Sequence, residues 1–261
     1  MILFSACTVS MKTSPSSNTE ISRGLLPVEG KLFTSLYQQR AAEYKALCLQ
    51  AFNIATLQLN ANTLTAPGLP KAIVTDIDET ILDNSPYAVH RALMGKEYDS
   101  ASWHEWSLRM EADTVPGAPA FLNYAASKGV EIFYITNRFE VDRESTMKNL
   151  KKFNFPNVDE AHMLMRTTTS EKGQRRQMVA SKFDVIMLLG DNLADFSDLF
   201  DKKTMEERNA NVDNSAAAFG KRFIVLPNPD YGDWEGALLK YNRKLTLPQK
   251  DSVYRSWLKG Y

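Results

Sequence analysis

Five short apolar runs alternate with helical segments through the middle and the second half of the chain. The runs are KAIVTDI (71–77), VEIFYIT (130–136), AHMLMR (161–166), DVIMLLG (184–190) and RFIVL (222–226). The segments of helical character between them are 116–129, 143–153, 170–182 and 214–221. Strands that alternate with helices pair in parallel, because the return to the same edge needs a crossover that a helix supplies. The sequence therefore predicts an α/β protein with a Rossmann-like parallel sheet flanked by helices.

Two regions outside this alternation also have helical character. Residues 30–65 carry apolar side chains at helical spacing and predict one long helix or a helix broken once. Residues 84–116 form an aromatic-rich insertion that is too long for a plain connection between a strand and a helix. We expect a small helical cap built from about 29–65 and 84–116, within one domain of residues 29–261.

Composition narrows the class of partner. The chain of 261 residues is 44% hydrophobic, and its 31 Lys and Arg residues balance 31 Asp and Glu residues. A zero net charge does not favour a nucleic-acid polymer or a polybasic contact with a membrane, so a small molecule is the expected partner. No coiled-coil or edge-strand pattern decides the oligomeric state, and a dimer remains open.

The first residues differ in character from the rest. A few apolar residues precede SAC, and a tract rich in Ser, Thr and Asn follows. Small residues before Cys7 resemble the processing box of bacterial lipoproteins, in which that cysteine becomes lipidated. Residues 1–28 are therefore interpreted as a truncated signal with a lipidation site and a flexible tether, or else as a tail whose cysteine has no role. Cys48 lies in an apolar helical stretch and is expected in the core.

Acidic and polar side chains follow three of the predicted strands. In an open parallel sheet, ligands bind beyond the carboxyl ends of the strands, so these side chains are expected at one rim. On a regular strand, residues i and i+2 share a face, so Asp76 and Asp78 can both be presented to one substrate. The side chains at the rim are Asp76, Asp78, Thr136, Asn137, Asp191 and Asp195.

Four carboxylates at one rim are costly without a cation. Hard oxygen ligands without neighbouring Cys or His suit Mg²⁺, which commonly binds one or two carboxylates together with a substrate phosphate. A lysine is needed to complete a phosphate site with Thr136. Lys172 in TSEKGQRRQ is the preferred residue, and its nearest competitors are Arg175 and Arg176.

The motifs DIDET, ITNR, a lysine and GDNLADF, in this order, resemble those of the haloacid dehalogenase superfamily of phosphohydrolases. More narrowly, DIDETILDNSPY, GDNLADF and LPNPDYGDWEGAL resemble the class C acid phosphatases, which are bacterial non-specific phosphatases typically anchored as outer-membrane lipoproteins. The resemblance extends from about residue 30 to the C-terminus. It implies a haloacid dehalogenase fold and a place in the bacterial cell envelope, in the outer membrane or the periplasm.

The resemblance also implies roles for the rim residues. Asp76 would be the nucleophile, and Asp78 would protonate the leaving group and then activate water. The Mg²⁺ ligands would be Asp76, the backbone carbonyl of Asp78 and Asp191, with Asp195 placed to hold metal-bound water. Thr136 and Lys172 would bind the phosphoryl oxygens.

Several other residues have competing interpretations. The resemblance implies that Trp103 and Tyr231 sandwich a nucleobase or another flat leaving group, although each aromatic could equally be a core residue. Asn137 is retained as a substrate-binding residue, whereas Arg138 is interpreted as a surface charge. Glu79 with its neighbour Thr80 fits a helix N-terminus. His90 and His104 receive no catalytic role.

Together these features predict an Mg²⁺-dependent acid phosphomonoesterase that hydrolyses nucleoside 5′-monophosphates and other small phosphate monoesters through an aspartyl phosphate. Two alternatives remain open. One is a cytoplasmic sugar or cofactor phosphatase of the same superfamily, which would follow if Cys7 is never lipidated. The other is a surface lipoprotein that binds a ligand without catalysis, although every motif position needed for turnover is present.

Overall fold

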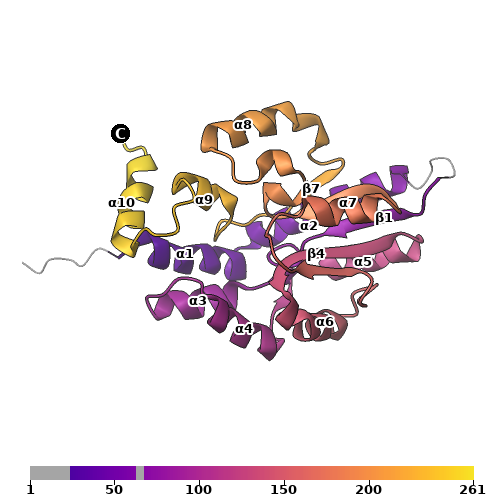
Figure 1. Ribbon diagram of the computed structural model, residues 1–261, viewed down its shortest axis with the longest axis horizontal. Helices are drawn as coiled ribbons and strands as arrows, with labels where there is room; N and C mark the ends of the chain where they lie inside the picture. Colours follow the sequence, from indigo (N-terminus) through magenta and orange to yellow (C-terminus); the bar gives the residue numbers. More distant parts are fainter. Residues whose placement is uncertain (1–23, 63–67) are drawn as a thin grey trace, which may run out of the picture.

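The computed structural model describes residues 24–62 and 68–261 (Figure 1). The predictions for Cys7 and most of the tether therefore lie outside the described residues. Within these ranges, no helix combines the length and the apolar character that crossing a bilayer requires.

The five predicted strands form one sheet in which every neighbouring pair is parallel. The strand order is β5-β4-β1-β6-β7, so β1 lies at the centre. This confirms the predicted α/β fold. The strands are β1 (Lys71–Thr75), β4 (Glu131–Phe139), β5 (Met163–Arg166), β6 (Asp184–Gly190) and β7 (Phe223–Val225). A separate antiparallel ribbon pairs β2 (Leu82–Asp83) with β3 (Asp113–Thr114).

Helices cover both faces of the sheet because successive side chains of its buried strands point to opposite sides. On one side, Ile73 of β1 joins a core cluster with residues of α2 (Ala42–Asn62), α5 (Ala118–Ser127) and α6 (Arg143–Lys152). On the other side, Ala72 and Val74 pack with Val179 of α7 (Gly173–Ala180). Figure 1 shows this layering, with α6 below the sheet and α7 above it.

The long N-terminal helix is broken once. Helix α1 (Leu26–Arg40) ends at Ala41, whose extended backbone (φ −76°, ψ 126°) turns the chain into α2. Helix α1 then packs against α3 (Ser85–Leu93), while α2 packs against α5 and β7. The insertion also contains α4 (Ser100–Arg109). The division of these segments into a cap and a core stays a prediction.

The segment before β7 differs from the prediction. A helix was expected at 214–221, but α8 spans Met205–Asn214, and only a 3₁₀ turn follows at Ala216–Ala218. A capping box explains the position of α8, because Thr204 accepts a hydrogen bond from the backbone of Glu207, and the Glu207 side chain accepts one in return. Other 3₁₀ turns span Glu140–Asp142, Leu193–Asp195 and Asp198–Phe200.

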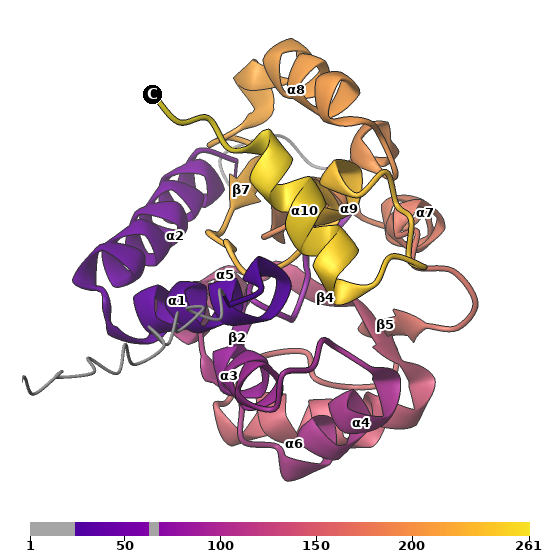
Figure 2. The same ribbon diagram turned by 90° about the vertical axis from the view of Figure 1, so that its left-hand side faces the viewer.

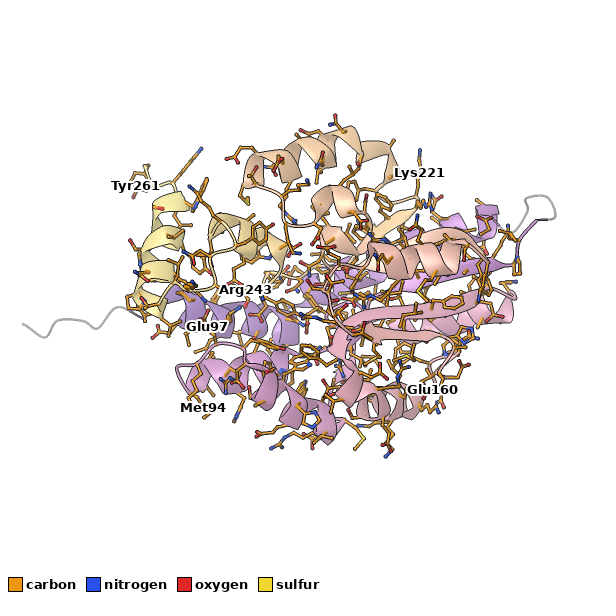
Figure 3. The ribbon with its side chains drawn as sticks, viewed as in Figure 1. Met94, Glu97, Glu160, Lys221, Arg243 and Tyr261 are labelled. Carbon is orange, nitrogen blue, oxygen red and sulfur yellow. The ribbon has the colours of Figure 1, made fainter. Side chains whose placement is uncertain are left out.

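The C-terminal segment closes one end of the molecule beyond the carboxyl ends of the strands. Helices α9 (Asp233–Leu238) and α10 (Leu247–Trp257) lie there beside α1 (Figures 1 and 2). Lys31 of α1 donates to the backbone carbonyl of Asp230 at 2.8 Å. Lys250 of α10 forms an ion pair at 2.7 Å with Glu97, which is labelled in Figure 3. These contacts hold the loop after β7 and the insertion around the rim of the sheet.

Candidate active site

Asp76 is the first residue after β1 and stays bound to the sheet. Its backbone N–H donates to the carbonyl of Leu189 in β6 at 3.0 Å, so the register of the central strands sets its position. The Nζ atom of Lys172 lies 2.7 Å from Oδ1 of Asp76. The carboxylate is therefore presented at the carboxyl edge of the sheet with a cation beside it.

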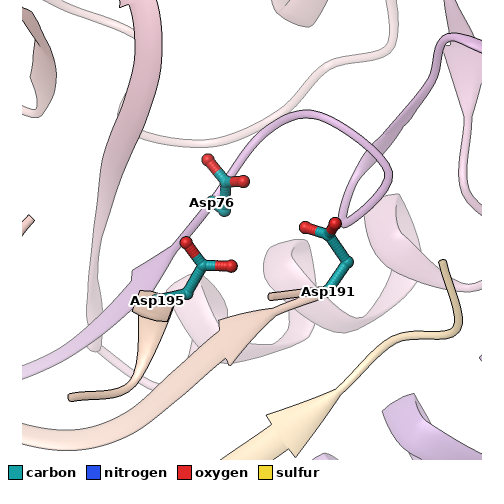
Figure 4. Close-up of side chains that lie close together, drawn as sticks. All are labelled: Asp76, Asp191 and Asp195. Carbon is teal, nitrogen blue, oxygen red and sulfur yellow. The ribbon is translucent and has the colours of Figure 1, made fainter. Parts of the chain in front are cut away.

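Asp191 and Asp195 follow the adjacent strand β6 and lie near Asp76. One carboxylate oxygen from each of the three residues falls within 4.8 Å of the others, and Figure 4 shows the three side chains around a common space. Asp191 accepts hydrogen bonds from Thr80, Asn192 and Asn228 at 2.6–3.0 Å. The three carboxylates therefore lie at one rim of the sheet, as their positions after β1 and β6 predict. Asn192 was a candidate for a supporting contact from the sequence, whereas the hydrogen bonds from Thr80 and Asn228 were not expected.

Lys172 lies at the N-cap of α7 and is 6% exposed. Its Nζ atom donates to Oδ1 of Asp195 at 2.6 Å, so it bridges two of the three carboxylates. Burial opposes the charged ammonium, but Asp195 and Asp76 outweigh it and raise the pKa of Lys172. The two competing arginines bind other groups: Arg175 donates to the backbone carbonyl of Thr136, and Arg176 donates to that of Ala194 and pairs with Asp198.

One ammonium does not balance the buried negative charge of this cluster. Burial raises the pKa of Asp76, against the lowering effect of Lys172, and the carboxylates of Asp195 and Asp78 add to the rise. Burial likewise raises the pKa of Asp191, and Asp195 adds to it. A set of carboxylate oxygens with uncompensated negative charge is the donor set that a hard divalent cation prefers. The residues present therefore fit a metal ion.

The interpretation of Arg138 as a surface charge is wrong. Arg138 is only 3% exposed, and its guanidinium binds Asp78. The Nε and Nη2 atoms donate to Oδ1 of Asp78 at 3.0 and 2.8 Å. Asn84 donates to the same oxygen at 2.9 Å. Asp78 is thus held on the side of the insertion, apart from the cluster that surrounds Lys172.

Thr136 and Asn137 occupy the end of β4. Thr136 is fully buried, and its hydroxyl oxygen accepts a hydrogen bond from the backbone N–H of Arg138 at 3.0 Å. Asn137 is exposed, and its side-chain oxygen accepts a hydrogen bond from Arg175 at 2.8 Å. Arg175 therefore supports both residues from α7, a contribution that the sequence did not reveal.

Glu79 is the second correction. It was interpreted with Thr80 as the start of a helix, but residues 79–84 are not helical, the next helix begins at Ser85, and Glu79 has a left-handed backbone (φ 55°). Its buried carboxylate accepts hydrogen bonds from the backbone of Asn84 and from the Tyr231 hydroxyl. Burial raises the pKa of Glu79, and Asp78 adds to the rise. The contact brings the loop after β7 against the turn that carries Asp78.

Trp103 lies in an aromatic cluster of the insertion and is 8% exposed. Its ring meets that of Tyr87 edge to face at 5.0 Å, and that of Tyr98 at 5.9 Å. The guanidinium of Arg138 lies 5.4 Å from the ring centroid. His104 pairs with the buried Asp142 at 2.6 Å and is not among the rim residues. Trp103 therefore contacts Arg138, which binds Asp78, whereas Tyr231 contacts Glu79, the residue that follows Asp78 in the chain.

Solved structures similar to this chain include those of the class C acid phosphatase of Bacillus anthracis. Two of them, one with tungstate bound, superpose with a TM-score of 0.87 and are 40% identical in sequence. Each covers 90% of this chain, and this chain covers 99% and 98% of theirs.

Curated relatives are more distant. Acid phosphatase 1 of Solanum lycopersicum is 26% identical over 167 residues, and the stem 31 kDa glycoprotein of Glycine max is 24% identical over 161 residues. The matches cover 60% and 59% of this chain, and this chain spans 57% of the length of each relative. The family description of the HAD superfamily, subfamily IIIB (acid phosphatase), matches residues 8–234. The chain therefore belongs to the haloacid dehalogenase superfamily, in its subfamily IIIB of acid phosphatases.

Proposed function

We propose that this chain is an Mg²⁺-dependent acid phosphomonoesterase that acts on nucleoside 5′-monophosphates and other small phosphate monoesters through an aspartyl-phosphate intermediate. The observation that carries the proposal is the position of Lys172 between Asp76 and Asp195, with Asp191 in the same cluster. Family membership and the B. anthracis relative with tungstate bound support it, because tungstate is a tetrahedral oxyanion like phosphate.

The chemistry divides between two carboxyl groups. Asp76 attacks phosphorus, a new bond forms between its oxygen and phosphorus, and the bond to the leaving oxygen breaks. Asp78 gives its proton to that oxygen, then accepts a proton from water as the water oxygen attacks phosphorus and releases Asp76. Lys172 binds the phosphoryl oxygens, with Thr136 at the end of the neighbouring strand. Asp76, Asp191 and Asp195 would hold Mg²⁺, whose charge neutralises the phosphate when bound.

The central experiment measures hydrolysis of para-nitrophenyl phosphate with and without EDTA. We expect wild-type turnover that EDTA abolishes and Mg²⁺ restores. Asp76→Asn should lower kcat about 1,000-fold or more while substrate still binds, because the amide keeps the shape of the carboxylate but is not a nucleophile. Asp213→Asn, at an exposed position of α8, is the matched control and should retain wild-type activity.

Two results would contradict the mechanism. Asp76→Asn activity within about tenfold of wild type, or roughly 1.4 kcal/mol of barrier, rules out a nucleophile at that position. Wild-type protein without activity favours the alternative of a surface protein that only binds its ligand, and activity that EDTA does not affect contradicts the dependence on Mg²⁺.

Metal binding can be tested without turnover. Isothermal titration calorimetry with MgCl₂ should detect a site in wild type, and Asp191→Asn should weaken the affinity about tenfold or more because it removes one anionic ligand. Asp213→Asn again serves as the control. Equal Mg²⁺ affinity in Asp191→Asn and wild type would remove Asp191 from the metal site.

The aromatic cluster of the insertion supports the proposed preference for flat leaving groups. Tyr98 is 58% exposed and lies beside Trp103, so this cluster is accessible from solvent. Trp103→Ala should raise KM for nucleoside 5′-monophosphates about fivefold, since a stacked aromatic pair contributes about 1 kcal/mol. KM for glycerol phosphate should stay within about twofold. Trp257→Ala, in exposed α10, is the control.

A profile across nucleotides, sugar phosphates and pyrophosphate complements this measurement. Equal KM changes for nucleotides and glycerol phosphate in Trp103→Ala would contradict a base-stacking role. A wild-type profile dominated by sugar phosphates would favour the alternative of a sugar or cofactor phosphatase.

For localisation, the proposal rests on the sequence SAC before the polar tether. In this proposal, a lipid on Cys7 anchors the protein in the bacterial cell envelope. Cells given a fatty-acid probe should label the wild type and the Cys48→Ser variant, whose substituted residue is buried in the core, but not Cys7→Ser. Unlabelled wild type would contradict the anchor.

A further inference from the structure

Arg138 is a buried cation that the mechanism above does not use. Besides the contacts with Asp78, its Nη1 atom donates to Thr146 of α6 at 3.1 Å and to Ser107 of α4 at 3.4 Å. Its Nη2 atom also donates to the side-chain oxygen of Asn84 at 3.3 Å. One guanidinium therefore joins the end of β4, the turn after β1 and the insertion.

Asn84 completes this network from the other side of Asp78. Its amide nitrogen donates to Oδ1 of Asp78 at 2.9 Å, and its amide oxygen accepts a hydrogen bond from the indole N–H of Trp106 at 2.9 Å. Trp106 and Ser107 are neighbours on α4. The orientation of the Asp78 carboxylate therefore depends on a helix of the insertion as well as on the sheet.

The same guanidinium supports the aromatic cluster. Trp103 lies on α4 one turn before Trp106, and its ring centroid is 5.4 Å from the central carbon of the Arg138 guanidinium. A buried ion pair of this kind contributes little net stability, because desolvation of both groups offsets much of their attraction. The contacts of Arg138 instead place its positive charge between Asp78, the proton donor of the proposed reaction, and Trp103, whose ring is proposed to contact the leaving group.

We propose that Arg138 is the positioning residue of Asp78, and that it holds the Asp78 carboxylate in place to deliver a proton to the leaving oxygen. This inference rests on the proposed function, in which Asp78 protonates the leaving oxygen. Arg138 does not contact the reacting atoms. It holds the carboxylate of Asp78 by two N–H donors in a fixed fork, a geometry that lysine cannot reproduce.

Leaving groups of different basicity test this positioning of Asp78. An alkoxide needs a proton to leave, whereas para-nitrophenolate leaves without one, so only alkyl phosphates depend strongly on Asp78. Arg138→Met should lower kcat/KM for glycerol phosphate about 100-fold but that for para-nitrophenyl phosphate less than about fivefold. The ratio kcat/KM is informative because it includes steps only as far as the departure of the leaving group.

Three further variants separate positioning from folding. Arg138→Lys keeps the charge without the fork and should show an intermediate loss on glycerol phosphate. Arg208→Met removes another buried arginine, which binds the backbone of Phe200 in the neighbourhood of α8, and should leave the ratio between the two substrates unchanged. In the Asp78→Asn background, Arg138→Met should lower kcat/KM for glycerol phosphate by less than a further factor of about two, because both substitutions remove the same function.

Equal losses on both substrates in Arg138→Met would overturn the inference and assign a purely structural role. If Arg138→Met does not fold, Trp106→Phe replaces it, since the variant keeps an aromatic ring but removes the N–H that holds Asn84. It should lower glycerol phosphate turnover selectively, by about threefold to tenfold, and an unchanged substrate ratio would also overturn the inference. Wild-type protein inactive on both substrates would instead refute the proposed function.

Discussion

The contact of Lys172 with Asp76 and Asp195 is the interaction on which the rest of the site depends. Parallel strands bring their carboxyl ends to one edge, so residues that follow β1 and β6 must share a small volume there. The buried ammonium offsets part of the resulting repulsion. Burial raises the pKa of Asp76 and Asp191, and the neighbouring carboxylates add to the rise. The remaining negative charge makes the cluster a fit for a divalent cation.

A second buried cation organises the other half of the rim. Arg138 binds Asp78 and contacts α4 and α6, whereas Lys172 comes from α7 on the opposite face of the sheet. The two carboxylates of the DIDET motif therefore have different partners, although only Ile77 separates them. This separation gives a physical basis for different roles: one carboxylate faces the carboxylate cluster, and the other faces the insertion and its aromatic side chains.

Much of the fold could be predicted because local sequence patterns determine its strands and most of its helices. The apolar runs at the five strands are buried by helices on both faces, and the break at Ala41 agrees with a helix broken once. The helix near 214–221 was misplaced because an alanine-rich stretch has helical propensity, whereas the capping box at Thr204 and Glu207 decides where the helix starts. Propensity is a weak guide where a cap competes with it.

The sequence by itself determined that strand ends would gather carboxylates and a lysine, because the order of motifs and the parallel topology follow from local patterns. Only the tertiary structure decided which side chains these charged groups contact. The sequence pattern indicates a surface charge at Arg138, but α4 and α6 bury it. The pattern indicates a helix start at Glu79, but the loop after β7 brings Tyr231 to its carboxylate. Such contacts join segments up to 152 residues apart, and no local pattern encodes which distant side chain will meet a buried charge.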